Sequence, residues 1–160
     1  MRRTRRSLAT HGAEIEREEA AMGAVEKKNE KIVKNFFKTL SSGNLEKLRP
    51  LFHERATWKV MATGIPGEGE RKGRDNIIDN FLGPVRGMFI PGDPKVHIDQ
   101  IICQGPLVAV EGRGLGTFKD GRPYSNRYAY VLELKDGKVL NFREYMDSYY
   151  VSQLGVRPDK

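Results

Sequence analysis

The sequence is poor in cysteine and histidine and has no long apolar run. Its single cysteine, Cys103, cannot form an internal disulfide. Because Cys103 lies in an apolar stretch without activating basic neighbours, we expect a core residue in a reducing cytoplasm. His11, His53 and His97 are too scattered for the usual spacings of a metal site. No apolar stretch approaches the roughly 20 residues that span a bilayer, which predicts a soluble protein without a membrane partner.

Positive charge exceeds negative charge, but no concentrated basic surface is predicted. The formal net charge is +7. One predicted helix carries five lysines, Lys27, Lys28, Lys31, Lys34 and Lys38. Their spacing alternates with the apolar stripe of that helix, which is typical of a solvated face. No strand that combines aromatic residues with arginine for base stacking accompanies them. Nucleic acid is therefore not expected as a partner.

The chain length suits one domain with a short appendage. Residues 1–22 are polar and charged without an apolar period, so we expect a disordered tail or a frayed helix. Residues 23–160 then form the domain.

Three segments have the apolar period of an amphipathic helix. The first covers residues 25–42 and ends at Gly43. Asn44 is a suitable N-cap for a shorter helix with apolar residues from Leu45 to Phe52. The third covers residues 75–89.

Strand patterns occupy most of the remaining chain. A strand is expected over 57–62, and the glycine-rich segment 64–69 after it reads as a mobile loop that could act as a lid. After residue 94 the apolar period changes to two. It predicts strands near 95–104, 107–118, 124–134 and 139–147. Asp120-Gly121 and Asp136-Gly137 separate the last three strands and predict two-residue hairpins.

This order of elements predicts an α+β fold with helices on one face of a mostly antiparallel sheet. The last strands are about twice the usual length, so the sheet must curve around the helices. Gly112, Gly114 and Gly116 favour such bending, because glycine permits bulges and kinks. Their Gly-x-Gly-x-Gly spacing lies inside a strand, which argues against a phosphate loop.

Several motifs resemble the SnoaL-like branch of the nuclear transport factor 2-like superfamily. They are the helix end at residues 39–45, the run 126–130, and the closing stretch 136–147. The resemblance covers roughly residues 28–155. It implies a cone-shaped, curved, mostly antiparallel sheet wrapped around three N-terminal helices and enclosing one apolar pocket. It also implies a homodimer formed through the sheet. The scaffold hosts isomerases, cyclases, epoxide hydrolases and non-catalytic proteins, so it does not fix the activity.

The ketosteroid isomerases of this superfamily use a tyrosine and a basic aspartate. The matching positions of this sequence hold Phe36 and Val60, neither of which can transfer a proton. Steroid isomerisation by that mechanism is therefore not expected.

The limonene-epoxide hydrolases are more similar in the last two strands. Their two catalytic aspartates match Glu111 and Glu144. Their bridging arginine falls on Ala109, and their water-positioning tyrosine and asparagine fall on Trp58 and Val60. The carboxylates are thus present, while the residues that hold the water differ.

Strand alternation predicts which side chains face the pocket. Side chains two residues apart share a face, so we expect three inward sets: Ala109, Glu111 and Arg113; Asn126, Tyr128 and Tyr130; Phe142, Glu144 and Met146. In that arrangement Arg113 keeps Glu111 ionised, while a less solvated Glu144 has a raised pKa. Glu111, Glu144 and Arg113 are therefore the predicted catalytic residues, acting by acid–base chemistry.

A small apolar or amphipathic organic molecule is the expected partner of this pocket. The predicted lining consists of Trp58, Val60, Phe81, Val85, Asn126, Tyr128, Tyr130 and Met146. No nucleotide or phosphate motif is present, so no cofactor is implied. Three functions remain open: a cofactor-independent isomerase, lyase or hydrolase; a module that binds its ligand unreacted; and a domain that binds a partner through the open sheet face. In the last two, Glu111 and Arg113 form a structural ion pair.

Overall fold

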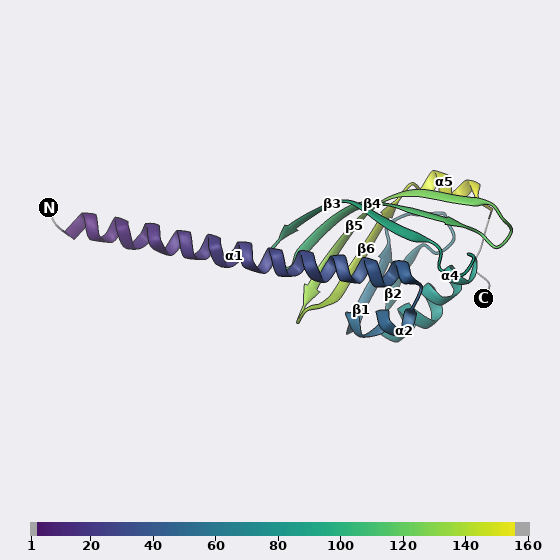
Figure 1. Cartoon of the computed structure of the whole chain (residues 1–160), viewed down its shortest axis with the longest axis horizontal. Coiled ribbons are helices and arrows are strands. Elements are labelled where there is room, and N and C mark those ends of the chain that lie inside the picture. Colours follow the sequence, from purple (N-terminus) through teal and green to yellow (C-terminus); the bar gives the residue numbers. More distant parts are fainter. Residues whose placement is uncertain (1–2, 156–160) are drawn as a thin grey trace.

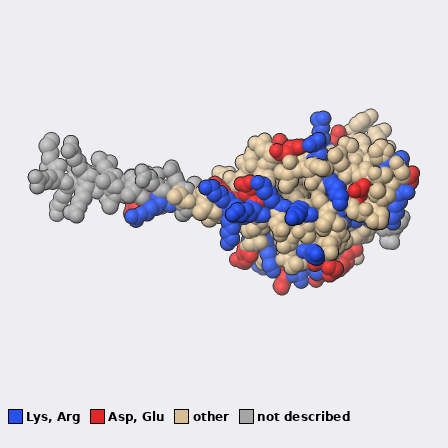
Figure 2. All heavy atoms as spheres, in the orientation of Figure 1, with Lys and Arg blue, Asp and Glu red and all other residues tan. Residues whose placement is uncertain are grey.

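The first helix supplies the apolar surface around which the sheet curves. The computed structural model describes residues 3–155, and α1 is continuous over Arg3–Ser42. The period seen in the sequence is confirmed, because Val33, Phe36 and Phe37 are buried while the five lysines are exposed. Figure 1 shows the first half of α1 extending beyond the sheet, and Figure 2 shows basic side chains along its second half. The division of the chain at residue 22 stays a prediction.

Two short helical elements follow α1 as its end residues predict. Gly43 has a φ of 76°, a left-handed conformation that ends the helix. The Asn44 side chain accepts a hydrogen bond from Lys47 N at 2.9 Å and caps α2 (Leu45–Leu48). The 3-10 turn η1 (Arg49–Leu51) continues it. Phe52, predicted in this helix, begins the first strand instead.

The third helix consists of three consecutive segments. They are α3 (Arg74–Ile77), the π-helical turn η2 (Ile78–Leu82) and α4 (Gly83–Gly87). Pro84 follows the wide turn and has no backbone N–H to donate, which fits a local departure from regular α-helix. Phe81 and Leu82 in the turn are buried against the sheet.

Six strands form one mixed sheet in the order β2-β1-β6-β5-β4-β3. Their bounds are β1 (Phe52–Val60), β2 (Gly69–Lys72), β3 (Lys95–Gln104), β4 (Leu107–Thr117), β5 (Pro123–Lys135) and β6 (Lys138–Met146). All neighbours are antiparallel except β1 and β6, which are parallel. The α+β class and the four long strands are confirmed. A short helix, α5 (Ser148–Gln153), ends the described chain.

One of the two predicted hairpin turns is correct. Asp136 and Gly137 alone connect β5 to β6, and both have positive φ. The other prediction is wrong, because five residues, 118–122, separate β4 from β5. Within that connection Phe118 N donates to Arg122 O at 2.9 Å, which extends the ladder by one pair and leaves Asp120-Gly121 in the turn.

The core lies between α1 and the inner face of the sheet. Phe36 and Phe37 contact each other edge to face, with ring centroids 5.5 Å apart. Phe36 also packs on Phe52, and Phe37 on Tyr130. Burial of one such aromatic side chain contributes roughly 2–3 kcal/mol. This cluster fixes the helix against β1, β5 and β6.

Candidate active site

Glu144 lies in the middle of the inner face of the sheet. In the register of β6 it is opposite Val60 of β1 and Tyr130 of β5. The residue is only 9% exposed. Trp58 Nε1 donates a hydrogen bond to Glu144 Oε2 at 2.7 Å. The indole is itself held by stacking on Phe142, with ring centroids 3.8 Å apart. The carboxylate is therefore oriented by a side chain that is fixed in the core.

The environment of Glu144 suits a group that exchanges protons near neutral pH. Burial raises the pKa of Glu144 to about 7, from a usual value near 4.5. The Trp58 hydrogen bond and the positive charge of Arg71 act in the opposite direction. Both the protonated and the ionised forms are consequently populated near pH 7, as general acid–base catalysis requires.

Two adjoining cavities meet at Glu144. The outer cavity has a volume of about 120 Å³ and the inner cavity about 80 Å³. Both are lined by Phe81, Val85, Pro94, Tyr128 and Glu144. The outer cavity is bounded by loop 61–68 and by α5, and the inner cavity by α1 and α4. Most of the lining is apolar, so a bound molecule would contact few polar groups besides Glu144.

A pair of tyrosines supplies a second polar feature of this wall. The hydroxyls of Tyr124 and Tyr128 are hydrogen bonded to each other, and Asn126 Nδ2 donates to Tyr124 Oη at 3.4 Å. Burial raises the pKa of Tyr124 to about 12 and places that of Tyr128 well above its usual value. Both phenols therefore stay neutral at physiological pH. If Tyr124 donates to Tyr128, the hydroxyl hydrogen of Tyr128 is left for the pocket.

Arg71 holds the loop that closes the outer cavity. Its Nη1 donates to the carbonyl oxygens of Gly67, Glu68 and Gly69 at 2.6, 2.9 and 3.1 Å. The guanidinium also lies 4.3 Å from the ring centroid of Phe81. Burial lowers the pKa of Arg71, and the charge of Glu144 opposes that effect. The lid predicted from glycine content is thus a loop pinned by one arginine.

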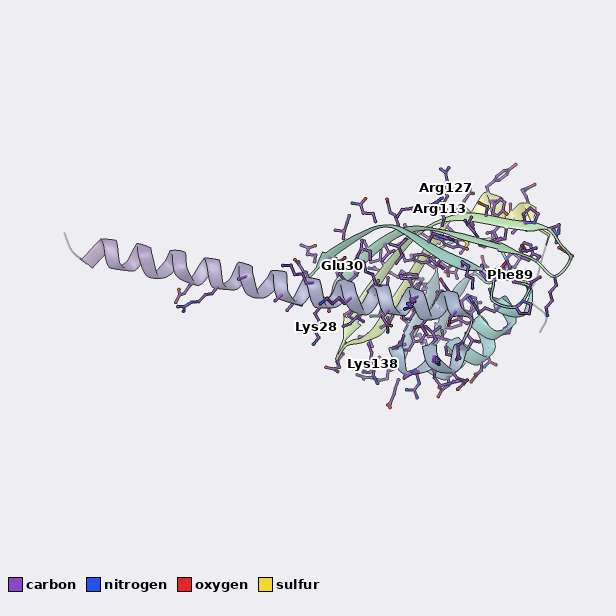
Figure 3. The ribbon with its side chains drawn as sticks, in the orientation of Figure 1. Lys28, Glu30, Phe89, Arg113, Arg127 and Lys138 are labelled. Atoms are coloured by element: carbon purple, nitrogen blue, oxygen red, sulfur yellow. The ribbon has the colours of Figure 1, made fainter. Side chains whose placement is uncertain are left out.

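The predicted inward orientation of Glu111 and Arg113 is wrong. Both residues are exposed, and Arg113 forms a two-pronged ion pair with Asp99 at 2.9 and 3.1 Å. Figure 3 shows Arg113 and Arg127 on the side of the sheet opposite α1. Among the residues that the structure describes, Glu144 is the one carboxylate that lines either cavity.

The reason lies in the alternation of β4. Val108 and Val110 are buried, so the even positions face inward. Gly112 and Gly114 continue that inward row; a Cβ on Gly112 would lie 2.5 Å from His97 O. A bulge lies in β3 at Asp99, whereas β4 pairs with β5 without a register shift. Gly112 and Gly114 thus lie where other atoms of the protein come too close to β4 for a side chain to fit.

Seven of the eight residues predicted to contact a ligand line a cavity. Trp58 and Tyr130 line the inner one, Val60 and Met146 the outer one, and Phe81, Val85 and Tyr128 both. Asn126 is buried, but it lines neither and instead hydrogen bonds to Tyr124.

Three polar residues of the site were not predicted. Tyr124 has the same strand parity as Asn126 and Tyr128, so extending the alternation by two residues would have found it. Arg71 and Arg86 have no comparable signal, because only the folded chain brings them to the cavities. Within residues 3–155 no group of three metal-binding side chains occurs, and no helix is both long and apolar enough to cross a bilayer.

Comparisons with known proteins show the same fold. Bal32a, from a soil-derived mobile gene cassette, superposes with a TM-score of 0.69 at 23% identity, covering 79% of this chain and 95% of its own. TerC, crystallised with polyporic acid, gives 0.68 at 19% identity, covering 79% and 97%. An LEH-like epoxide hydrolase of M. tuberculosis gives 0.67 at 16% identity, covering 80% and 89%. A comparison with curated proteins found no match.

These similarities extend over about four fifths of the chain. At such identities they show a shared fold and leave the activity open. Residues 33–142 match the family described as SnoaL-like domain, a span that includes the C-terminal end of α1, the lid loop and most of the sheet. The chain therefore belongs to the SnoaL-like domain family and has the nuclear transport factor 2-like fold.

Proposed function

We propose that this protein is a cofactor-independent enzyme that moves a proton within a small, mostly apolar substrate, as isomerases and cyclases do. Glu144 is the general base and acid. The observation that carries the proposal is the position of its carboxylate, buried where two apolar cavities meet and bound through one oxygen to Trp58. A pKa of about 7 lets the same group remove a proton and return it at neutral pH.

The proposed step is proton transfer next to a carbonyl group. Ionised Glu144 takes a proton from the carbon beside the carbonyl, and the electron pair of that C–H bond moves toward the carbonyl oxygen. Protonated Glu144 then returns the proton at the same or a neighbouring carbon. The acid and base forms alternate, so nothing is consumed and no redox partner is needed.

Tyr128 supports this step as a hydrogen-bond donor. Negative charge develops on the substrate oxygen as the proton leaves, and a neutral phenol in an apolar wall stabilises such charge. Asn126 and Tyr124 orient Tyr128 through their shared hydrogen bonds. Trp58 orients the base from the other side of the pocket.

The geometry favours proton transfer over epoxide hydrolysis. Hydrolysis by two carboxylates requires both of them at the substrate, and Glu111 lies on the opposite face of the sheet. A single buried carboxylate beside a phenol pair is sufficient for isomerisation.

The homodimer and the cytoplasmic location also stay proposals. The outer face of the sheet carries the exposed apolar side chains Ile102, Leu107 and Tyr145, which supports pairing through that face.

The proposal is tested by hydrogen–deuterium exchange into small ketones. A panel that includes 2-tetralone is incubated in D2O, and exchange beside the carbonyl is followed by proton NMR. We expect the protein to accelerate exchange, and Glu144→Gln to lose about 100-fold or more of that rate. Glu111→Gln is the matched control, because it removes a carboxylate from the outer face, and it should exchange at the wild-type rate.

Two results would contradict the proposal. If the Glu144→Gln variant exchanges deuterium at the wild-type rate, Glu144 is not the group that transfers the proton. If no ketone of the panel exchanges faster than in buffer although some of them bind, the pocket belongs to a module that holds its ligand unreacted.

A further inference from the structure

Arg86 is a half-buried cation that lines the inner cavity. It lies on α4 and lines that cavity together with Tyr130 and Glu144, and its guanidinium lies beside Pro94 and close to Gly43 at the end of α1. Its recorded hydrogen bonds go to one acceptor, Pro94 O, from Nη1 and Nη2 at 3.5 Å each. These distances are at the long limit for a hydrogen bond. Asp93 acts on it by charge, but within residues 3–155 no carboxylate lies within the 4.0 Å of a salt bridge to Arg86.

The other half-buried arginines near the helices are well paired. Arg49 forms salt bridges with Glu46, Asp75 and Asp79 at 2.9, 2.9 and 2.7 Å. Arg71 donates to three carbonyl oxygens. Arg86 by contrast keeps most of its five N–H donors without a short bond to the protein. A half-buried guanidinium without short bonds to the protein has donors available for an acidic ligand.

The chemistry of this group selects the ligand. A guanidinium presents its donors in a planar fork that matches the two oxygens of a carboxylate. The neighbours of Arg86 in the inner cavity are mostly apolar, among them Leu40, Leu82 and Val96. A charged head group can therefore bind at Arg86 only while the rest of the molecule lies along apolar walls.

We propose that Arg86 binds the carboxylate of the substrate, which is a small amphipathic carboxylic acid. Its head group lies in the inner cavity, and its apolar part extends along Phe81 and Val85 into the outer cavity, past Glu144. This inference rests on the proposed function in one respect only, since it takes the cavities around Glu144 as the substrate pocket. It adds the substrate class and a residue that recognises it.

The test compares acids with their neutral amides. Phenylacetate, 3-phenylpropionate and cyclohexylacetate are titrated beside the matching amides, at about pH 6, where Glu144 is mostly protonated. Binding is followed by calorimetry and by the fluorescence of Trp58, the single tryptophan of the chain, which lines the inner cavity. We expect at least one acid to bind about tenfold or more tightly than its amide.

The variants decide whether Arg86 causes this preference. Arg86→Gln should abolish the preference for the acid while leaving the affinity for the amide nearly unchanged, and Arg86→Lys should keep part of it. Arg74→Gln is the matched control; Arg74 pairs with Asp75 at 3.2 Å, away from the cavities, and the variant should retain the preference.

The proposal is overturned if no acid of the panel binds better than its amide, or if Arg86→Gln retains the preference. Such a failure would be distinct from a failure of the proposed function. The acid–amide comparison measures Arg86 in a binding assay, whereas deuterium exchange into a neutral ketone measures Glu144.

Discussion

The proton affinity of Glu144 is set by groups with opposing effects. Burial in an apolar wall favours the neutral acid, while the Trp58 N–H and the Arg71 guanidinium favour the anion. An uncompensated buried carboxylate would remain protonated well above neutral pH, and a fully compensated one would be a weak base. The opposing effects together give Glu144 a pKa between these two limits.

Trp58→Phe tests this balance at the level of one bond. Phenylalanine keeps an aromatic ring for stacking on Phe142 but lacks the N–H that donates at 2.7 Å. Because that bond stabilises the anion, its loss should raise the pKa of Glu144 above about 7. The pH at which deuterium exchange reaches half its maximum should move upward. An unchanged pH profile would show that the indole does not tune the base.

Sequence reasoning located Glu144 correctly but misplaced its supposed partner. The alternation of Phe142, Glu144 and Met146 predicts the inward face, because an apolar residue lies two positions before Glu144 and another two positions after it. In β4 the apolar residues Leu107 to Val110 are consecutive, so either parity fits the pattern. The sequence alone could not decide between them. Residues brought together only by tertiary structure, such as Arg71 and Arg86, left no local signal at all.

Among the elements, β4 shows how glycine shapes the pocket. A Cβ on Gly114 would lie 2.9 Å from Tyr128 Cε2, and one on Gly116 would lie 3.0 Å from Pro94 Cα. Because these positions have no side chain, the ring of Tyr128 and the segment that leads into β3 pack directly on β4. The cavity walls thus depend on a row of glycines. From the sequence, these glycines were expected only to let the strand bend.

Alanine substitutions along β4 should destabilise the fold to different degrees, according to the atoms that each new methyl group contacts. Gly114→Ala contacts the end of a side chain and should destabilise the fold by about 1–3 kcal/mol. Gly112→Ala meets the His97 carbonyl at 2.5 Å, a backbone atom, and should cost more. Gly87→Ala, where no atom lies within 4 Å, is the control and should be neutral. Urea unfolding measures all three; equal stability of the two strand variants and the control would contradict this account.

The long strands could be predicted because their apolar period persists for nine residues or more. The short elements β2 and α5 could not be predicted. β2 has no buried residue in its four positions, and α5 likewise has none, so neither carries an apolar pattern. Both nevertheless border the site, since α5 contributes Val151 to the outer cavity and β2 carries Arg71.

The whole molecule combines a stable core with an inner face that holds an ionisable group. The aromatic cluster around Phe36 and Phe37 belongs to the core, and the inner cavity adjoins that core at Trp58 and Tyr130. A carboxylate placed between them is a thermodynamic burden when ionised. This burden makes the stability of the entire domain depend on pH.

Glu144 should lower the stability of the wild type as the pH rises. Its folded-state pKa of about 7 exceeds the usual value of 4.5, so the folded protein binds its proton more tightly. The resulting stabilisation is complete below about pH 4.5 and is lost by about pH 7. Relative to Glu144→Gln, the free energy of unfolding should fall by about 3 kcal/mol across that range. Denaturation in a series of buffers measures the difference, and parallel curves for the two proteins would contradict the prediction.

The most direct measurement is the titration of the Glu144 carboxyl carbon by carbon-detected NMR, with Glu144→Gln to assign its signal. The account predicts a midpoint of about 7, because the group is buried at the junction of the two cavities. A midpoint near the usual 4.5 would mean that water reaches the carboxylate freely. Glu144 would then be a poor acid at neutral pH, and the central claim would be wrong.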